Sequence, residues 1–474
     1  MKVCIVAEGC YPYVVGGVSG WIHSMIQTFP DVEFVILSII SDREQSGKFQ
    51  YEMLPNVTAV YEAYLNDVDW KPSKRRKMVR LNKIQYRAVR SIVMNTETDW
   101  NVLFDLFRDK RFSVDDLLMG EDFLRIVEEF YNKEYPQIVF SDFLWTMRSI
   151  YLPLFLILNT EIPKADIYHC VATGYAGVLG GMAEHAFGCG LIVSEHGIYT
   201  REREEEILKA HWVSGIYKNI WIDQFRKMSI LAYERADLVT ALYGHARHLQ
   251  IDLGCDPNKT MITANGIDVS RFVNLSGKQP EDEGMVNVGA VLRLAPIKDV
   301  KTMINAFAFA KKKVPNLKLW IMGPMDEDLE YAEECKELVS VLKLQDVEFT
   351  GRIDVRDYLG RMDFTILTSI SEGQPLTILE SYAAKKPTIA TDVGNCRELI
   401  YGEEGDLFGT AGILTHIMNT EEIAEAMVEL ATNVSKREAM GEIGYKRVHA
   451  FYRIEQMKQK YREIYKDVYN KVKG

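Results

Sequence analysis

Short apolar runs alternate with longer amphipathic stretches along most of the 474-residue chain. The first group of apolar runs, each of strand length, covers residues 3–7, 32–40, 167–170, 191–194, 238–241 and 261–264. The second group covers residues 285–292, 317–322, 347–350, 364–367 and 388–391. Apolar strands that alternate with helical patterns predict parallel sheets covered by helices on both faces. The sequence therefore predicts an α/β protein with two doubly wound, Rossmann-like domains, and ligands at the carboxyl ends of the strands.

A turn followed by a polar stretch separates the two groups of runs and marks the domain boundary. Asn265-Gly266 is a strong turn signal. We therefore expect a first domain over residues 1–275 and a second over residues 284–450. Residues 451–474 have the pattern of a long terminal helix, which we expect to pack back toward the first domain.

A long polar segment, residues 41–135, interrupts the strand–helix rhythm of the first domain, and we expect it to be a mostly helical insertion. Its basic stretch, residues 71–90, has two interpretations: a solvated helix face, or a region that binds an anionic surface or a partner. Asp67 and Asp69 have a spacing that can hold Mg²⁺ or Mn²⁺. Because they lie in the polar insertion rather than at a strand end, we expect them to be solvated.

The balance of charge excludes one class of partner. The net charge is −11 and the pI is near 5.5, whereas broad binding of nucleic acid needs a basic surface. Apolar residues make up 47% of the chain, which is enough for two sizeable cores. We therefore expect a globular protein with no nucleic-acid partner.

The cysteines and the longest apolar runs indicate in which cellular compartment the protein is expected. The seven cysteines are scattered, odd in number and without metal-type spacing, which is typical of free thiols in a reducing compartment. The N-terminal apolar run is too short for a secretion signal. The run at residues 150–158 is too short to span a bilayer and contains Pro153. We expect a cytoplasmic protein.

The strongest candidate for chemistry is a pair of carboxylates, Glu372 and Glu380, with seven residues between them. Pro375 fits the first turn of a helix that would run to about Lys386, because its missing N–H costs nothing there. Glu372 would lie on the loop before this helix and Glu380 inside it, with free backbone amides between them. This arrangement suits a phosphate flanked by acceptors for sugar hydroxyls, as a sugar nucleotide requires. A surface helix with scattered acidic residues is the alternative.

A glycine-containing loop, residues 8–19, follows the first predicted strand. Gly16 and Gly17 would let the backbone approach a ligand closely because they have no side chain, and amides of such a loop can hold phosphate or sugar hydroxyls. The loop lacks the Gly-x-Gly-x-x-Gly pattern, which disfavours NAD. A structural tight turn is the alternative.

Two histidines lie at the ends of consecutive predicted strands. His169 ends the strand that begins near Asp166, and His196 directly follows the next strand. The carboxyl ends of neighbouring parallel strands meet at one edge of a sheet, so both side chains would face a ligand there. Neutral imidazole can hydrogen-bond a sugar hydroxyl. A structural role is the alternative for each histidine.

Arg293 and Lys298 follow the first strand of the second domain. Two cations in a loop before a helix suit a diphosphate leaving group, because charge-assisted contacts strengthen as negative charge develops on it. A solvated basic loop is the alternative. Arg352 and Ile353 follow a later strand of the same domain.

Together these motifs resemble those of the GT4 family of retaining glycosyltransferases, in the family's order over residues 2–453. Glu372 and Glu380 match its Glu-x7-Glu signature, and Arg293 and Lys298 match its Arg-x4-Lys motif. The resemblance implies the GT-B fold, in which two Rossmann-like domains face each other across a cleft. Only the insertion departs from the common family pattern.

The resemblance also implies roles for the candidate residues. Glu380 would bind the ribose, Glu372 would bind the hexose with the backbone that follows it, and His169 would bind a sugar hydroxyl. The residues implied at the reacting centre are Glu372, His169, Lys298 and Arg293. The residues implied in substrate binding are Gly16, Gly17, His196, Arg293, Lys298, Arg352, Ile353, Glu372, Gly373, Gln374, Pro375, Leu376, Thr377 and Glu380.

The function that the resemblance implies is retaining transfer of a hexose or N-acetylhexosamine from a UDP-sugar, without a metal or cofactor. The extended first domain and its opening segment, residues 8–21, resemble those of family members that act in exopolysaccharide synthesis. The acceptor that this resemblance implies is a growing polysaccharide. A membrane synthase complex is a further partner, which would recruit the chain to the inner face of the membrane. Two alternatives stay open: a non-catalytic UDP-sugar-binding subunit of such a synthase, and a UDP-sugar epimerase.

Overall fold

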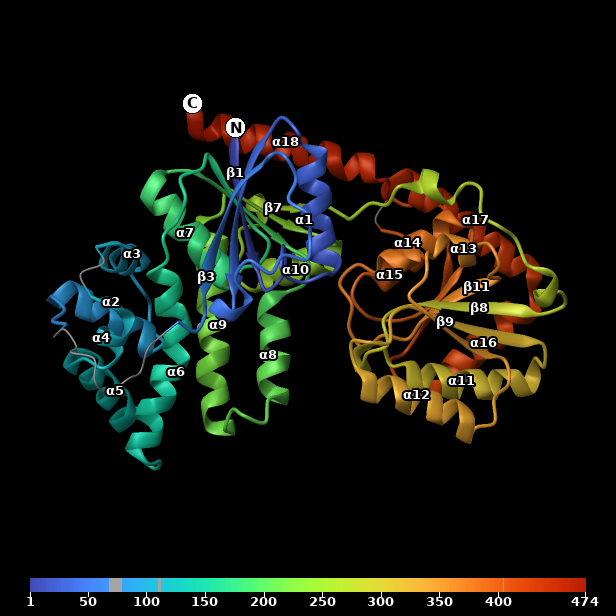
Figure 1. The fold of residues 1–474 in the computed structure, drawn as a ribbon, viewed down its shortest axis with the longest axis horizontal. Coiled ribbons are helices and arrows are strands. Elements are labelled where there is room, and N and C mark those ends of the chain that lie inside the picture. The colour runs from blue at the N-terminus through green and yellow to red at the C-terminus, as the bar shows by residue number, and fades with distance from the viewer. Residues whose placement is uncertain (68–78, 110–111, 404) are drawn as a thin grey trace. The chain divides into compact units, whose positions relative to one another are not determined.

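Two units, each with its own sheet, make up the chain (Figure 1). The computed structural model describes residues 1–67, 79–109, 112–403 and 405–474. The first unit comprises Met1–Ala241, Arg247–Met261 and Arg462–Gly474. The second unit comprises Leu242–Ala246 and Ile262–Tyr461.

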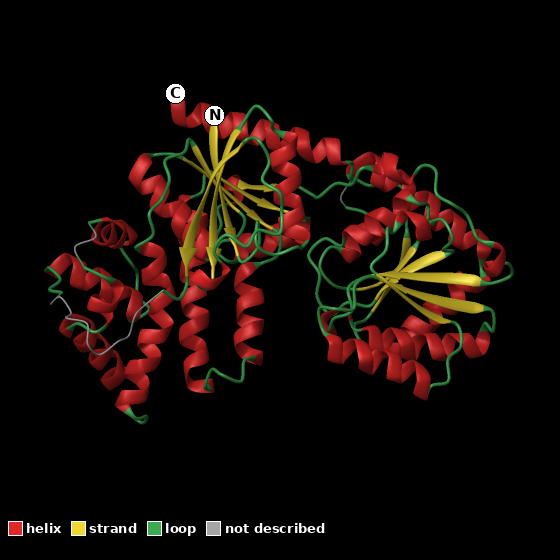
Figure 2. Ribbon diagram, viewed as in Figure 1, coloured by secondary structure: helices red, strands yellow, loops and turns green. Residues whose placement is uncertain are grey.

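The first unit is built on a sheet whose order, in the described residues, is β3-β2-β1-β4-β5-β6-β7. Its strands are β1 (Lys2–Glu8), β2 (Glu33–Ile40), β3 (Val57–Tyr64), β4 (Ile167–Cys170), β5 (Gly190–Glu195), β6 (Leu238–Ala241) and β7 (Thr260–Ile262). β1 is parallel to both neighbours, with Val3 opposite Phe34 of β2 and Ile167 of β4. The inner residues of β1 are buried because helices flank the sheet on both sides (Figure 2).

Strand β3 lies within the segment expected to be a helical insertion. It pairs in parallel with β2 at the edge of the sheet. Of its eight residues only Ala63 is buried, so it has no continuous apolar run. The inserted part of the chain therefore begins after Tyr64, later than residue 41.

Helices of the first part of the chain cover this sheet and form the insertion. They are α1 (Gly17–Thr28), α2 (Lys83–Val93), α3 (Trp100–Arg108), α4 (Val114–Leu118), α5 (Glu121–Glu134), α6 (Phe140–Leu158), α7 (Tyr175–Phe187), α8 (Tyr199–Lys209), α9 (Gly215–Arg235) and α10 (Gly244–Asp252). Helices α2 to α5 make up the insertion after β3. Residues 71–78 of the predicted basic stretch, and Asp69 of the predicted carboxylate pair, lie outside the described residues.

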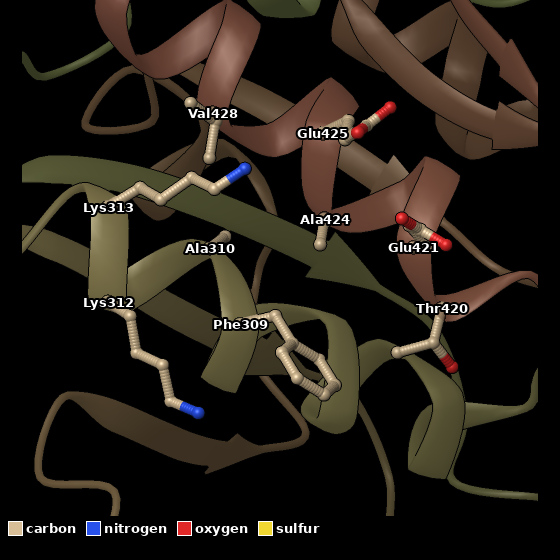
Figure 3. Close-up of a pocket in the computed structure, with 9 residues that line it drawn as sticks. All are labelled: Phe309, Ala310, Lys312, Lys313, Thr420, Glu421, Ala424, Glu425 and Val428. Atoms are coloured by element: carbon tan, nitrogen blue, oxygen red, sulfur yellow. The ribbon is translucent and has the colours of Figure 1, made fainter.

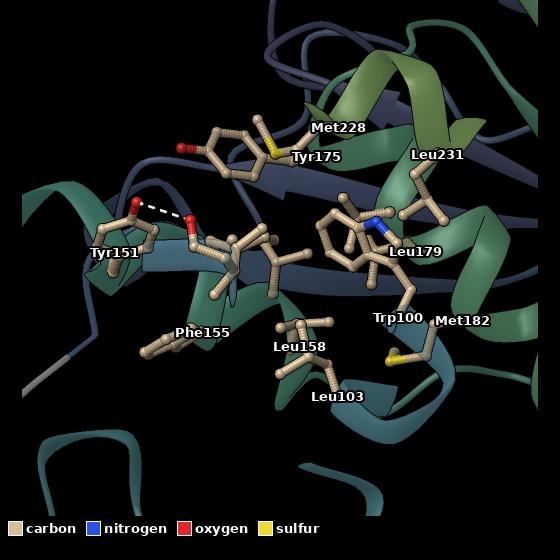
Figure 4. Packing of buried hydrophobic residues seen from close by; sticks show 14 of the residues in the cluster. Trp100, Leu103, Tyr151, Phe155, Leu158, Tyr175, Leu179, Met182, Met228 and Leu231 are labelled. Carbon is tan, nitrogen blue, oxygen red and sulfur yellow. Dashed lines mark hydrogen bonds between the residues drawn. The ribbon is translucent and has the colours of Figure 1, made fainter. Parts of the chain in front are cut away.

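The insertion shares a hydrophobic core with the helices that cover the sheet (Figure 4). Trp100 and Leu103 of α3 belong to the same buried cluster as Phe155 of α6 and Leu179 of α7. The hydroxyl of Tyr151 on α6 donates a hydrogen bond to the carbonyl at the end of α2, at 3.1 Å. Burying each such large side chain contributes about 1.5–3 kcal/mol. The insertion is therefore an integral part of the first unit.

The second unit is built on a sheet whose order in the described residues is β10-β9-β8-β11-β12-β13. Its strands are β8 (Val286–Val291), β9 (Leu317–Met322), β10 (Val347–Gly351), β11 (Phe364–Leu367), β12 (Thr388–Thr391) and β13 (Gly412–Thr415). Its helices include α11 (Val300–Lys313), α12 (Leu329–Val341), α13 (Arg356–Leu359), α14 (Leu376–Ala383), α15 (Cys396–Tyr401), α16 (Thr420–Thr432) and α17 (Val434–Phe451). The two doubly wound α/β domains predicted from the sequence are confirmed.

The terminal helix α18 (Ile454–Lys473) ends within the first unit, to which Arg462–Gly474 belongs. The ring of Tyr465 packs on Phe29 with the ring centroids 5.5 Å apart. Lys473 Nζ lies 3.0 Å from a carboxylate oxygen of Asp166. The C-terminal end of the chain thus covers the first unit beside β4.

Two further sequence expectations concern cysteines and membrane spans. All seven cysteines are free thiols, and Cys10 alone among them is partly exposed. In the parts of the chain that are described, each helix is too short or too polar to cross a bilayer.

Candidate functional site

The predicted helix after Glu372 is present as α14 at the carboxyl edge of the second sheet. Pro375 is its N-cap residue with extended backbone angles, one position earlier than expected. The helix ends at Ala383, short of Lys386, because Lys385 adopts a left-handed conformation with φ of 57°. No side chain in the described residues caps its N-terminus. The first amides of α14 therefore lack helical acceptors and face away from the helix.

Glu372 and Lys298 form an ion pair in front of this helix. Lys298 Nζ lies 2.5 Å from Glu372 Oε1, and the two side chains are only 15% and 12% exposed. Ser369 Oγ donates to the same carboxylate oxygen at 2.5 Å. The hydroxyl of Thr368 donates to the carbonyl of Lys298 at 3.0 Å, which ties the loop after β8 to the end of β11. The structure thus brings together two residues that the sequence predicted separately.

A second loop, after β12, supports the backbone of Glu372. Gly394 has a φ of 51°, and a Cβ there would lie 2.2 Å from the carbonyl oxygen of Glu372. The amide of Asn395 donates to the carbonyl of Gly373 at 2.8 Å. Gln374 accepts a hydrogen bond from the amide of Asn265 at 2.7 Å. Backbone contacts therefore hold the predicted hexose-binding segment in place.

Polar atoms without partners gather beside this segment. Both side-chain atoms of Asn395, which is fully buried, lack a hydrogen-bond partner in the described residues. Gln374 Nε2 is also buried and has no hydrogen-bond partner among the described residues. Buried polar groups are normally satisfied, so unsatisfied ones indicate a place for a ligand or water.

Glu380 lies just over one turn inside α14. Burial raises the pKa of its carboxyl to about 7, an effect that the nearby Arg271 opposes. Its carboxylate accepts no hydrogen bond from the residues that are described. A shielded acceptor of this kind, beside a helix N-terminus, can receive two hydroxyl hydrogen bonds.

The remaining candidates of the second unit lie elsewhere along the same edge. Arg293 is 54% exposed and pairs with Glu327 at 2.6 Å, so it does not contact Glu372. Arg352 lines a pocket at the ends of β9 and β10, together with Met325. Ile353 packs instead against a small core around Trp320.

In the first unit, His169 is fully buried in β4. Its Nδ1 lies 2.8 Å from the Tyr465 hydroxyl, and its Nε2 lies 2.7 Å from Ser194 Oγ. Burial lowers the pKa of its imidazole to about 3, so the ring is neutral. Both ring nitrogens are therefore occupied by side chains, and a sugar-binding role for His169 stays a prediction.

His196, at the end of β5, lines a pocket of about 200 Å³. Its Nε2 is shielded from solvent and has no hydrogen-bond partner in the described residues. Burial lowers the pKa of this imidazole to about 4. The ring of Trp21 packs edge-on against it, with centroids 4.5 Å apart. Of the two predicted histidines, His196 is the one with a ring nitrogen that has no hydrogen-bond partner in the described residues, although this nitrogen has no exposed surface.

The same pocket contains charged residues that sequence reasoning did not select. Glu8 ends β1, while Glu202 and Arg203 come from α8. The one available signal was the position of Glu8, a carboxylate at a strand end directly before the glycine loop. Gly16 and Gly17 lie in that loop, and a Cβ at either would meet no atom within 4 Å. Their role in close approach to a ligand stays a prediction.

A separate hollow of the second unit contains none of the predicted residues (Figure 3). It measures about 420 Å³ and lies between the end of α11 and the beginning of α16. Phe309 and Ala424 give it an apolar floor, with lysines on one rim and glutamates on the other. It includes no strand end, which is where ligands of doubly wound sheets bind.

Two family descriptions match the chain, one on each part. Residues 1–258, just over half of the chain, match the family described as "Domain of unknown function (DUF3492)". Residues 285–433 match the family described as "Glycosyl transferases group 1". The second match contains the ion pair of Lys298 and Glu372 and the helix α14.

Two curated relatives are similar over part of their length. The D-inositol 3-phosphate glycosyltransferase of Kineococcus radiotolerans is 27% identical over 240 residues, 46% of this chain and 54% of the relative. The alpha-monoglucosyldiacylglycerol synthase of Streptococcus pneumoniae is 31% identical over 217 residues, 40% of this chain and 46% of the relative. The chain thus spans about half the length of the curated relatives that it matches.

A solved structure is similar over nearly the whole chain. HepE of Anabaena, in complex with UDP and glucose, has a TM-score of 0.59 and 15% sequence identity. The likeness covers 98% of this chain and 99% of HepE. It shows that the fold is of the GT-B type, as the sequence predicted.

Proposed function

We propose that this chain, which belongs to the family described as a domain of unknown function (DUF3492), is a glycosyltransferase that uses a UDP-sugar donor. One observation carries the proposal: Lys298 and Glu372 are paired in front of the uncapped N-terminus of α14, with Glu380 just inside that helix. The match of residues 285–433 to glycosyl transferases group 1 supports it. The UDP and glucose named for the HepE complex support the choice of donor.

The donor diphosphate would bind at Lys298 and the first amides of α14, those of Leu376 and Thr377. A helix N-terminus carries a partial positive charge and free N–H groups, which suit a phosphate. Lys298 adds a full charge, and its low exposure of 15% strengthens its attraction for an anion. The phosphate would displace the Glu372 carboxylate from Lys298. Arg293 would leave its ion pair with Glu327 and bind the donor diphosphate instead.

The ribose, the hexose and the nucleobase of the donor would bind to residues on either side of the diphosphate. Glu380 would accept hydrogen bonds from the ribose hydroxyls, since its carboxylate has no partner in the described residues. Glu372, with the backbone of Gly373 and Gln374, would accept those of the hexose. The pocket at the ends of β9 and β10, lined by Arg352, would hold the nucleobase.

In the proposed reaction, the bond between the anomeric carbon and the diphosphate oxygen breaks as the acceptor oxygen bonds the same carbon. The acceptor hydroxyl gives its proton to the leaving phosphate, and UDP departs. We expect retention at the anomeric carbon, with attack on the face from which the phosphate leaves. Lys298 and the α14 amides stabilise the charge that develops on the phosphate, so the mechanism needs no protein nucleophile and no metal.

The first unit would contribute His196 as a hydrogen-bonding group for a sugar. The lack of a partner for its Nε2 in the described residues supports this role, whereas the two partners of His169 support an indirect one. His169 contacts Ser194 of β5, two residues before His196. We therefore propose His169 as a positioning residue that fixes the end of β5.

For the acceptor, we propose a growing exopolysaccharide. The segment from Glu8 to Trp21, Glu-Gly-x-Tyr-Pro-Tyr-x-x-Gly-Gly-Val-Ser-x-Trp, resembles the opening of PelF, the cytosolic glycosyltransferase of Pel exopolysaccharide synthesis. The transferred unit would be a hexose or N-acetylhexosamine. A membrane synthase complex would then receive the product at the inner face of the membrane.

Calorimetric titration with UDP and UDP-glucose tests the donor site. Lys298→Ala should weaken UDP binding by about 1.5–3 kcal/mol, the value of a charged hydrogen bond, which is roughly a 10- to 150-fold loss. Lys312→Ala, on α11 of the same unit, is a matched control that should leave affinity unchanged. Failure of the protein to bind UDP, or equal affinity in both variants, would refute the donor site.

Product analysis then separates transfer from the two alternatives. Incubation with UDP-glucose and an oligosaccharide from the native polysaccharide should release UDP and extend the oligosaccharide. An epimerase would instead convert the donor sugar without any acceptor. A non-catalytic subunit would bind UDP with the same dependence on Lys298 and release nothing.

A further inference from the structure

The hollow between α11 and α16 on the second unit combines an apolar floor with two charged rims (Figure 3). Phe309, Ala310 and Ala424 contribute to the floor. Phe309 is the largest of these side chains, and it is 55% exposed. An exposed apolar surface that polar residues surround is typical of a site of protein–protein contact. The hollow therefore has the composition of an interaction surface.

Each rim of the hollow carries charge of one sign. Lys312 and Lys313 end α11 on one side, while Glu421 and Glu425 lie on α16 on the other side (Figure 3). Glu421 and Glu425 are four positions apart on one helix, where like charges repel each other. In the described part of the chain, neither of these glutamates has an ion-pair partner, and Lys313 has none either. The two rows of charge therefore do not neutralise each other across the floor.

A second copy of this chain fits the charge pattern of the two rims. In a dimer with two-fold symmetry both copies use the same surface, so the surface must be complementary to itself. A two-fold axis that runs along the hollow places α11 of one copy opposite α16 of the other. The lysine rim of each copy then meets the glutamate rim of the other copy. A helix of another protein would need one acidic and one basic edge at the same spacing, whereas a second copy carries both by symmetry.

The same rotation fills the hollow. It turns Phe309 on α11 of each copy toward Ala424 and Val428 on α16 of the other copy. The hollow measures about 420 Å³, which is enough room for an aromatic ring. The centre of a stable interface is packed as densely as a protein interior, and buried aromatic side chains contribute much of its affinity. We therefore expect Phe309 to be the main apolar contact of the dimer.

We propose that the face formed by α11 and α16 joins two copies of this chain in a two-fold symmetric dimer. Phe309 of each copy enters the hollow of the other, and the lysine and glutamate rims form ion pairs between the copies. The hollow contains none of the residues proposed for the donor site. Each copy therefore keeps its own donor site, and the dimer does not depend on the proposed glycosyltransferase activity.

Sedimentation velocity of the full chain, at concentrations from about 1 to 100 μM, tests this association. The wild type should pass from monomer to dimer as its concentration rises. Phe309→Asp should raise the dissociation constant of the dimer at least about thirtyfold, because it puts a carboxylate where a ring would be buried. Phe451→Asp is the matched control, since Phe451 is 47% exposed in the same unit, and it should dimerise as the wild type does. A wild type that stays monomeric over this range would overturn the proposal, and so would a dimer that Phe309→Asp leaves intact.

Exchange of charge between the rims distinguishes this dimer from other arrangements. Lys312→Glu/Lys313→Glu makes both rims acidic, and Glu421→Lys/Glu425→Lys makes both rims basic. Each double variant alone should stay monomeric, because every contact between rims then joins like charges. An equal mixture of the two variants should form a heterodimer, since every contact again joins opposite charges. A mixture that stays monomeric, or a double variant that dimerises alone as the wild type does, contradicts the proposed arrangement.

Thermal melting and UDP titration of the same variants separate loss of the dimer from loss of the fold. The five substituted residues of the hollow are exposed, so the variants should melt close to the wild type. Their affinity for UDP should equal that of the wild type, because the donor site uses other residues. If only variants that melt lower lost the dimer, unfolding would explain the loss and the proposal would be wrong. Failure of the wild type to bind UDP would refute the proposed function and not the dimer, which sedimentation tests independently.

Discussion

Replacement of Glu372 by Gln should strengthen the binding of UDP while weakening the advantage of UDP-glucose over UDP. The carboxylate of Glu372 lies 2.5 Å from Lys298 Nζ, in a setting where both side chains are at least 85% shielded. A diphosphate that uses Lys298 must displace this carboxylate and then lie beside its negative charge. A charged hydrogen bond contributes about 1.5–3 kcal/mol, and Gln keeps a carbonyl acceptor but no charge. If the substitution removes about half of the energy by which Glu372 competes with the diphosphate for Lys298, the affinity for UDP should rise by about 1 kcal/mol, roughly fivefold.

The assay is calorimetric titration of wild type and Glu372→Gln with UDP and with UDP-glucose. The ratio of the two affinities should fall in the variant by a similar factor, because a neutral amide accepts hexose hydroxyl bonds more weakly than a carboxylate. Glu421→Gln, at the rim of the hollow between α11 and α16, is the matched control and should change neither affinity. A fall in UDP affinity as large as that of Lys298→Ala would refute the reasoning, because it would mean that Glu372 assists the phosphate instead of competing with it.

Three further predictions concern the same edge of the second sheet. Burial raises the pKa of the Glu380 carboxyl from 4.5 to about 7, so the folded state binds this proton more tightly than the unfolded state does. The free energy of unfolding therefore falls as pH rises from about 4.5 through 7. Glu380→Gln should be more stable than wild type at pH 8, by up to about 3 kcal/mol and with a higher melting temperature, and should match wild type at pH 5. Equal melting curves at pH 8 would contradict that. Gly394→Ala should weaken UDP-glucose binding at least about tenfold, since a Cβ 2.2 Å from the Glu372 carbonyl must move that loop; unchanged affinity would show that the loop yields freely. Chelation with EDTA should change UDP affinity less than about twofold, because Lys298 and the α14 amides supply the positive charge, and restoration of lost binding by Mg²⁺ would disprove this.

The sequence pattern predicted the inner strands and two edge strands, β7 and β10, and missed the other two edge strands, β3 and β13. The runs at 167–170, 317–322 and 388–391 coincide with β4, β9 and β12. Such strands consist of apolar residues because helices cover both faces. β3 and β13 are edge strands with half-exposed residues, so their sequences contain no continuous apolar run. Their place in the sheets depends on tertiary pairing, which a single sequence does not encode locally.

In the candidate site, features that depend on neighbouring residues could be predicted from the sequence, and contacts between residues far apart in the chain could not. The order of Glu372, Pro375 and Glu380 around a helix start is a local pattern. The sequence predicted Glu372 on the loop and Glu380 in the helix correctly, and it missed the place of Pro375 by one position, because Pro375 is the N-cap rather than part of the first turn. The pairing of Glu372 with Lys298 joins residues 74 positions apart. The preference for His196 over His169 depends on the hydroxyl of Tyr465, 296 positions from His169. Both facts require the folded chain, because only the partner decides whether a buried polar group is free for a ligand.

The pocket around His196 and the ion pair of Lys298 and Glu372 lie at the same topological position of their two sheets. In the first sheet the strand order reverses direction between β1 and β4, and in the second between β8 and β11. Chain segments leaving such a pair of strands diverge to opposite faces, which opens a crevice at their carboxyl ends. Glu8 is the last residue of β1 in one sheet, and Lys298 and Glu372 follow β8 and β11 in the other. The two crevices differ in charge: the first fills its helix N-terminus with the carboxylate of Glu8, while the second leaves that of α14 uncapped beside a lysine. That difference supports the proposed placement of the donor diphosphate in the second unit.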